Sequence, residues 1–473
     1  MILSQYRMKR QLSGIAHHSN ISNPTFKVLS YRNSPVPRFK TKMSQGTDRR
    51  SRLAALGLRD MSIGYPHRDN SILGFSESTI REDARATRIV VHPEYPKLVQ
   101  AFLAHKRAHG SSVEKRVYGA DPARWTWKHQ VARLVDKRPL AFLNATDSTR
   151  LRNGADLPNA PNEWDNVGTE ADFTGPLPAN QRNNMLALDE YLSYDEIMLG
   201  SLLGVSGPSH FINDGNRYNQ ARRGAAGTFE PRGVIVGLVG PRFERPDHMD
   251  SALILPPVSR PRQHPELTAL FQDFFRTAGG AAREPGSRAA FHDAAYKARI
   301  RVTADILLLE ANRRAAAAGK DAYVYVVGLG LGVWRVAANQ PQLYVEAFGD
   351  AIDSLGAAGS LDSVRTIEFA WVNADSATHK EVIDAGDAYG IDVKFSRRNP
   401  AAKLEGREAD QLLVLSYAWD GNAFPGNEYW LGSLAASGDP AAACMSTIAE
   451  LHNPVMNPAF LDRVEVLGGD GGQ

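Results

Sequence analysis

Short apolar runs alternate with helix-like segments along the second half of this chain, and the alternation restricts the folds open to it. The apolar runs fall at 233–240, 322–327, 366–372, 392–395 and 411–417. The helix-like segments fall at 265–276, 291–317, 341–357, 378–389 and 440–451. Near-continuous apolar strands between helices are typical of a mostly parallel sheet covered on both faces. The sequence therefore predicts an α/β fold, in which ligands bind at the carboxyl ends of strands.

The rest of the chain divides around this core, which we place at 209–460. Residues 1–85 are expected to form a basic, disordered tail, because no acidic residue precedes Asp48 and Ser, Asn and Pro are frequent. The same composition fits a mitochondrial transit peptide, and this alternative stays open. Residues 86–208 predict a mainly helical N-terminal lobe, and the Gly-rich end at 461–473 is expected to fray.

Charge and cysteine content exclude several kinds of protein. The chain has 55 basic and 52 acidic residues, whereas nucleic-acid binders gather a basic excess on one face. Cys444 is the only cysteine of the chain, so intramolecular disulfides and cysteine zinc clusters are excluded. The small residues before Cys444 predict that its thiol packs in the core and does not act as a nucleophile. No apolar run approaches the ~20 residues that span a bilayer. We expect a cytoplasmic protein, or an organellar one if the N-terminus is a targeting segment.

Closely spaced glycines follow one of the apolar runs. Gly328, Gly330 and Gly332 come directly after the run at 322–327. A loop without side chains lets backbone N–H groups approach an anion, and a concave row of such donors binds diphosphate. Taken alone, the pattern also fits a tight strand-to-helix turn or the Gly-rich turn of a dinucleotide enzyme.

A second polar loop, at 211–219, combines a carboxylate, amides and a guanidinium. Asp214 can accept a hydrogen bond from the exocyclic amine of an adenine, and Arg217 can pair with a phosphate. The alternative interpretations are an ordinary Asp-Gly turn and a structural ion pair.

The third segment follows the last apolar run and carries three carboxylates, Asp420, Glu428 and Asp439, among aromatic and glycine residues. Three carboxylates in one pocket can grip a guanidinium, which prefers planar, multi-point acceptors. A carboxylate beside a glycosidic carbon can also act as a general acid or base. Alternatively, Asp439 before Pro440 caps the last helix, and Asp420 belongs to a turn.

Taken together and in this order, these loops resemble a known family. The stretches that carry the resemblance are 211–217, 328–334, 426–430 and 437–443. They are similar to the macrodomain-like ADP-ribosylhydrolase family typified by the Legionella effector MavL, which acts on ADP-ribosylated ubiquitin. The resemblance covers roughly 88–457. It implies a macrodomain-like three-layer α/β/α core that binds ADP-ribose and cleaves its bond to an arginine.

The resemblance also implies a role for each loop. Asp214 is expected at the adenine, and Asp420, Glu428 and Asp439 around the distal ribose and the target guanidinium. Glu428, which stands where an aspartate is expected, or Asp439 would be the catalytic acid or base. Backbone N–H groups of Gly330, Leu331, Gly332 and Val333 are expected at the diphosphate. The other ligand-binding residues that the resemblance implies are Asn213, Arg217, Gly328, Trp334, Asn427 and Ser437.

Two other functions fit the same loops. A non-catalytic reader would bind ADP-ribosylated protein without turnover. A nicotinamide-dependent oxidoreductase would use the glycine loop, although no acidic residue follows at the end of a second strand. The expected partner is an ADP-ribosylated protein, with ubiquitin as one candidate, and neither nucleic acid nor membrane. We expect no cofactor and no metal; a magnesium site among the three carboxylates is the alternative.

Overall fold

The computed structural model describes residues 43–61, 63, 69–123, 125–143, 147–157, 160–173, 186–256, 258, 261–277, 291–432, 434 and 440–468. The chain divides into two compact units, residues 1–51 and 52–473. In the first unit the structure describes the beginning of helix α1 (Met43–Ala55). All the other elements belong to the second unit.

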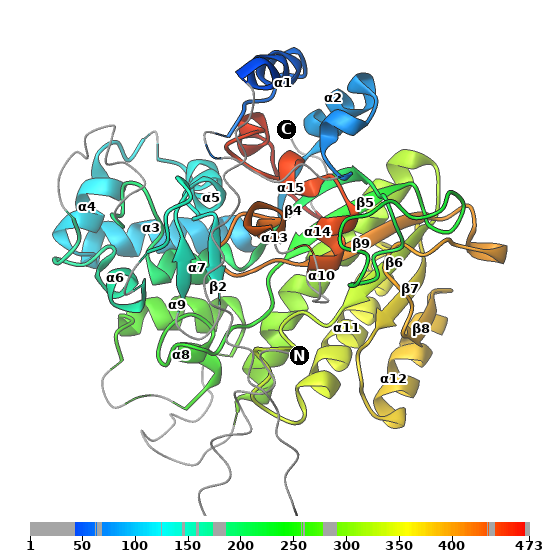
Figure 1. Ribbon diagram of the computed structural model, residues 1–473. Helices are drawn as coiled ribbons and strands as arrows, with labels where there is room; N and C mark the ends of the chain where they lie inside the picture. The colour runs from blue at the N-terminus through cyan, green and yellow to red at the C-terminus, as the bar shows by residue number, and fades with distance from the viewer. Residues whose placement is uncertain are drawn as a thin grey trace, which may run out of the picture. The chain divides into compact units, whose positions relative to one another are not determined.

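An eight-stranded mixed sheet forms the centre of the second unit (Figure 1). In space the strands follow the order β10-β1-β4-β5-β9-β6-β7-β8. In the part of this spatial order that runs β5-β9-β6-β7-β8, all neighbouring strands are parallel. Strand β4 is antiparallel to both β1 and β5. The bounds are β1 (Arg88–Val91), β4 (Leu203–His210), β5 (Arg232–Leu238), β6 (Ala322–Val327), β7 (Val364–Ala370), β8 (Asp392–Ser396), β9 (Leu412–Ala418) and β10 (Val464–Val466). The predicted α/β class with a mostly parallel sheet is confirmed.

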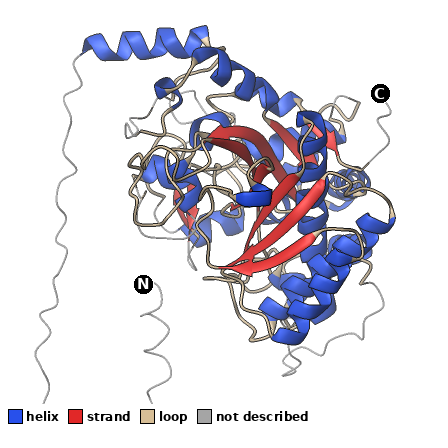
Figure 2. Cartoon of the chain, turned by 90° about the vertical axis from the view of Figure 1, so that its right-hand side faces the viewer, coloured by secondary structure: helices blue, strands red, loops and turns tan. Residues whose placement is uncertain are grey.

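Helices cover both faces of this sheet (Figure 2). Ser206 of β4 donates a hydrogen bond to Glu310 of helix α10 at 2.6 Å. Farther along the same strand, Ser209 accepts one at 3.0 Å from the N–H of Thr447, which caps α15. Because side chains of a strand alternate between its faces, these two serines point to opposite sides. One layer holds α10 (Asp293–Ala318), α11 (Gln340–Ala357) and α12 (Ser376–Asp387), and the other holds α13 (Asn427–Leu431), α14 (Pro440–Met445) and α15 (Ile448–Leu451).

The predicted helical lobe packs beside the sheet, on the left in Figure 1. Helix α3 buries Leu98, Phe102 and their neighbours at helical spacing, and a capping box of Ser111 and Glu114 begins α4. Helices α8 and α9, which follow β5 in the chain, belong to the same lobe. The lobe elements are α3 (Tyr95–His109), α4 (Ser112–Gly119), α5 (Trp127–Asp136), the hairpin of β2 (Ala141–Leu143) and β3 (Ser148–Arg150), α6 (Ala160–Asn166), α7 (Tyr194–Gly200), α8 (Ser251–Ile254) and α9 (Pro265–Phe274).

The observed organisation differs from the expected boundaries in three places. The segment 86–208 supplies β1 and most of β4 to the sheet, so the sheet does not begin at Ser209. The end that was expected to fray supplies β10, which pairs with β1. The expected tail contains the 3-10 helix η1 (Ile72–Gly74) and α2 (Glu77–Ala86), because Leu53, Ile72 and Ile80 are fully buried. Strands of three or four residues carry too little pattern to assign them to a sheet.

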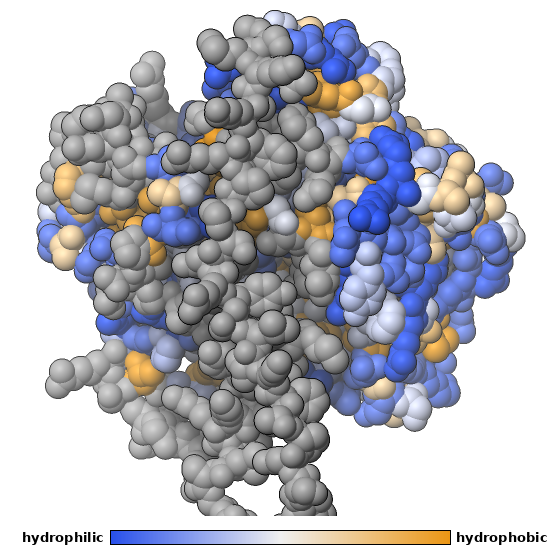
Figure 3. Space-filling view, viewed as in Figure 1, coloured by the Kyte–Doolittle hydropathy of each residue, from blue (hydrophilic) through white to orange (hydrophobic). Residues whose placement is uncertain are grey.

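Figure 3 shows the hydropathy of the surface residues on the side of the molecule drawn in Figure 1. Over the helices on its right, described residues are mostly hydrophilic, with hydrophobic ones scattered singly. Two short 3-10 helices, η2 (Gly406–Glu408) and η3 (Pro458–Asp462), complete the described elements. Within the described ranges, no helix has the length and apolarity needed to cross a membrane.

Candidate functional site

Strand β9 delivers the acidic segment to the middle of the sheet. It lies between β5 and β6, so the chain leaves it at the carboxyl edge of the parallel strands. Trp419 follows the strand, is 1% exposed and donates its indole N–H to the carbonyl of Ala423 at 2.6 Å. The guanidinium of Arg138 lies 3.9 Å from the centre of that ring and donates to the carbonyl of Gly421 at 2.7 Å. These contacts fix the turn that carries Asp420.

Asp420 and Glu428 come from this turn and from the short helix that follows it. Asp420 is half-buried, and the amide of Asn427 donates to its Oδ2 at 2.8 Å. Glu428 is 6% exposed, and its Oε2 accepts a hydrogen bond from the hydroxyl of Tyr417 at 2.8 Å. The strand and helix α13 therefore hold the Glu428 carboxylate between them.

Gly426 allows α13 to begin at this point. Its φ is +70°, in the region that favours glycine, and a Cβ there would lie 2.7 Å from the Cα of Ala449. The start of α13 thus packs directly against α15. Two predicted residues, Ser437 and Asp439, lie outside the described residues.

The glycine loop leaves β6 beside this turn. Gly330 has a φ of +76°, and a Cβ at Gly240 after β5 would lie 2.4 Å from the Gly330 nitrogen. The glycines are therefore needed for close contact between the ends of β5 and β6. Gly332 differs, because it is exposed and a Cβ there would meet nothing within 4 Å.

Several N–H groups of this loop are available to a ligand. The N–H of Leu331, expected at the diphosphate, is not one of them, because it donates to the carbonyl of Gly328 at 3.0 Å and closes the turn. Those that form no hydrogen bond with any described residue belong to Gly330, Gly332, Val333 and Trp334. Unpaired backbone donors in consecutive positions are the groups that bind an anion.

Arg242, which follows β5, connects the glycine loop to the acidic segment. Its guanidinium lies 5.8 Å from the centre of the Trp334 ring, and a Cβ at Gly421 would lie 3.6 Å from its Cδ. It is 2% exposed and donates to Asp147 at 2.5 Å and to Glu244 at 3.1 Å. Burial raises the pKa of Glu244, and the charge of Arg242 offsets part of that rise.

The Asp214 loop starts from a different edge of the sheet. Because β4 is antiparallel to β5, its end lies beside the beginning of β5. The Asp214 carboxylate accepts hydrogen bonds from the N–H of Asn216 at 3.1 Å and from the amides of Asn219 and Asn399, both at 2.7 Å. Burial acts to raise the pKa of Asp214, but these hydrogen bonds outweigh it and lower that pKa. The ionised carboxylate can only accept, as an adenine amine requires.

The other predicted residues of this loop have separate roles. Asn213 is buried, donates to the carbonyl of Arg222 at 2.9 Å and accepts from the N–H of Gly215 at 2.8 Å, so it shapes the loop. Arg217 is exposed and makes no hydrogen bond or ion pair with any described residue. Its neighbour Tyr218 is 73% exposed.

Helix α14 lies between the Asp214 loop and Glu428. The N–H of Ile212 donates to the carbonyl of Met445 at 2.7 Å, which joins the loop to this helix. Cys444 is fully buried, and burial, with a smaller contribution from the charge of Glu428, raises the pKa of its thiol to about 11. The predicted buried packing thiol is confirmed. No hydrogen bond or ion pair between described residues joins Asp214 itself to the glycine loop.

Several residues of this region were not among those predicted from the sequence. Tyr417 stands inside an apolar strand, and Arg138 and Asp147 belong to the lobe, so no local pattern connects them with the site. Asn422 is fully buried, and neither polar atom of its side chain is hydrogen-bonded within the described structure. A buried amide without hydrogen-bond partners destabilises the fold unless a ligand or a water molecule bonds to it. In the sequence, the only signal that could have pointed to Asn422 was its position two residues after Asp420.

A separate hollow of about 670 Å³ lies at the opposite edge of the sheet. Its lining includes Asp321, Thr366 and Asp392, near the amino ends of β6, β7 and β8. None of the predicted site residues lines it, so it does not belong to the candidate site.

Comparisons with known proteins identify the family of this chain. The model of a family described as ADP-ribosylhydrolase MavL-like matches residues 69–260 and 280–466. A Drosophila melanogaster protein named ADP-ribosylarginine hydrolase is 36% identical over 417 residues, covering 81% of this chain and 78% of its own. A second Drosophila melanogaster protein with the same description is 33% identical over 420 residues, covering 80% and 78%. The chain belongs to the MavL-like ADP-ribosylhydrolase family.

Proposed function

We propose that this protein releases ADP-ribose from arginine side chains of a modified protein. The observation that carries the proposal is the position of the glycine loop, whose unpaired N–H groups lie beside the segment of Asp420 and Glu428 through Arg242. The first loop suits a diphosphate and the second an arginine-linked sugar. Family membership and the names of the two Drosophila relatives support the same activity.

Hydrolysis of this linkage adds one water across the bond between the anomeric carbon and the guanidine nitrogen. The hydroxyl goes to the carbon, and the proton goes to the leaving guanidine. We assign acid or base work to Glu428, because Tyr417 and α13 hold its carboxylate in place. Asp420 would face the target guanidinium, and Asp439 would share in the acid–base role.

The remaining parts of the proposal concern ligand and partner. Asp214 would accept from the adenine amine, and Arg217 would meet a phosphate. The partner would be an ADP-ribosylated protein in the cytoplasm, with ubiquitin as the candidate that the resemblance implies. The chemistry calls for no cofactor.

Two measurements on the full chain test this function. ADP-ribose and NAD⁺ are titrated separately while thermal unfolding is followed, because a ligand that binds the folded state raises the midpoint. The protein is then incubated with arginine-ADP-ribosylated protein, and released ADP-ribose is quantified. We expect stabilisation by ADP-ribose above that by NAD⁺, together with release. Binding without release would establish a reader instead, and stronger stabilisation by NAD⁺ would favour an oxidoreductase.

A further inference from the structure

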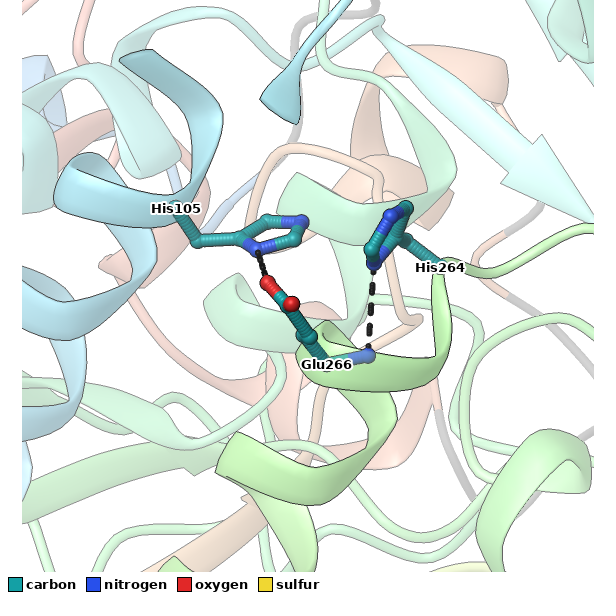
Figure 4. Close-up of side chains that lie close together, drawn as sticks. All are labelled: His105, His264 and Glu266. Atoms are coloured by element: carbon teal, nitrogen blue, oxygen red, sulfur yellow. Dashed lines mark hydrogen bonds and ion pairs between the residues drawn. The ribbon is translucent and has the colours of Figure 1, made fainter. Parts of the chain in front are cut away.

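Four side chains of the lobe, away from the candidate site, meet between two helices. His105 and His109 lie one turn apart on α3 and therefore share a face. His264 is the N-cap residue of α9, and Glu266 belongs to the first turn of that helix. Figure 4 shows His105, His264 and Glu266 pointing toward one another from the two helices.

The distances suit a small cation. One ligand atom each of His105, His264 and Glu266 lies within 4.8 Å of the other two. Nδ1 of His105 is 3.6 Å from Oε2 of Glu266, and Nε2 of His109 is 3.2 Å from the same oxygen. Ligands bound to zinc at 2.0–2.1 Å in a tetrahedron are about 3.3 Å apart. Only small side-chain movements would be needed to complete such a site.

The neighbouring hydrogen bonds and ion pairs are compatible with a metal at this place. His264 uses Nδ1 to accept from the N–H of Glu266 at 3.3 Å, which leaves Nε2 as the ring nitrogen for a ligand. The ammonium of Lys106 is itself paired with Glu114 at 2.6 Å and Asp195 at 2.5 Å.

We propose that these residues bind a divalent transition-metal ion of the zinc type. His105, His264 and Glu266 are three ligands, and His109 is in position to become the fourth. Imidazoles with one carboxylate select zinc-like ions over magnesium or calcium, which prefer oxygen ligands. The ion would link α3 and α9 within the lobe, so its role is structural. The sequence predicted no metal, and the residues proposed here come from distant segments of the chain.

The test uses the full chain after chelator treatment and dialysis. Zn²⁺ is titrated by calorimetry, and Co²⁺ is added separately to detect the visible absorption of a tetrahedral site. We expect saturable binding of about one ion per chain, a raised thermal midpoint with Zn²⁺, and no comparable effect of Mg²⁺.

The variants distinguish metal binding at this site from nonspecific binding by surface histidines. His264→Asn keeps a good helix cap but removes the imidazole, and Glu266→Gln keeps the shape of an exposed side chain. Each should abolish saturable Zn²⁺ binding and the tetrahedral Co²⁺ spectrum while circular dichroism stays unchanged. His129→Gln, on the exposed part of α5, should change neither. The proposal is overturned if the wild-type chain shows no saturable binding, or if the folded His264→Asn and Glu266→Gln variants bind like wild type.

Discussion

Glu428 is buried, and its carboxylate accepts a hydrogen bond from the hydroxyl of Tyr417. Glu428→Gln keeps the size and hydrogen-bonding capacity of the side chain but removes its charge and titrating proton. On the proposed mechanism, turnover falls by on the order of a hundredfold or more, while ADP-ribose affinity changes little. Single-turnover release assays and calorimetric titration measure the two quantities.

A matched control is Glu381→Gln, because Glu381 is exposed on α12. It should release ADP-ribose at the wild-type rate. Unchanged turnover in a folded Glu428→Gln protein would remove this residue from the mechanism and leave Asp439 as the acid–base candidate.

Asp214 allows a test of ligand orientation. Because its carboxylate is ionised and held by three donors, Asp214→Asn should weaken ADP-ribose more than ribose 5-phosphate, which lacks adenine. Asn219→Ser removes one donor but keeps the carboxylate, so it should affect both ligands only slightly. Equal weakening of both ligands in Asp214→Asn would show that the residue shapes the loop and does not contact adenine.

At the residue scale, prediction from the sequence succeeded for groupings within one segment and for burial. The turn after β9 brings Asp420, Asn427 and Glu428 together as one segment, and Cys444 is buried as predicted. It failed for Leu331, because the hydrogen bond that closes a turn depends on backbone conformation. It also missed Asn422, whose lack of partners becomes visible only once its neighbours are placed.

At the scale of elements, a substitution in the glycine loop can test ligand binding without disturbing the fold. Gly332→Val should abolish ADP-ribose binding and leave the fold intact, because a Cβ there meets no protein atom within 4 Å but would project where the diphosphate is proposed. Thermal-shift titration measures binding, and circular dichroism checks the fold. Gly119→Val is the control, because Gly119 at the end of α4 has similarly open surroundings. A folded Gly332→Val protein that binds like wild type would move the phosphate site elsewhere.

Element type was predictable from the sequence wherever the apolar runs were long. The runs at 233–240, 322–327 and 411–417 became β5, β6 and β9, which are largely buried. The last predicted helix, 440–451, is instead α14 and α15, separated at Ser446, where the chain pairs with Phe211. Such a bridge is a tertiary contact that helical periodicity cannot reveal.

For the whole molecule, a buried histidine predicts sensitivity to acid. Burial, together with the charge of Arg314, lowers the pKa of His452 to about 3, against about 6.5 in an unfolded chain. Between these values the unfolded chain binds one more proton than the folded one. The free energy of unfolding should therefore be unaffected by His452 above pH ~6.5 and fall by up to about 1.4 kcal/mol per unit below it.

Urea unfolding from neutral to acidic pH measures this dependence. His452→Gln should flatten the decline, provided that circular dichroism shows a native fold. His129→Gln, at an exposed position, should keep the wild-type slope. Identical slopes in all three proteins would assign the acid sensitivity to other groups.

Contacts between distant segments were the part of the whole molecule that the sequence could not predict. The pairing of β10 with β1 and the packing of α3 against α9 each join segments far apart in the chain. Their short elements carry no pattern that specifies a partner. The family match covers residues 69–260 and 280–466, which include most of the lobe and β10.

The measurement that tests the central claim most directly compares linkages. The wild-type chain is incubated with proteins that carry ADP-ribose on arginine, glutamate or serine, and loss of the modification is followed by mass spectrometry. We expect release from arginine, because only a guanidinium calls for gathered acidic side chains such as Asp420 and Glu428. The Glu428→Gln protein should be greatly slowed on the same substrate. Release from glutamate or serine, with arginine left intact, would contradict the account.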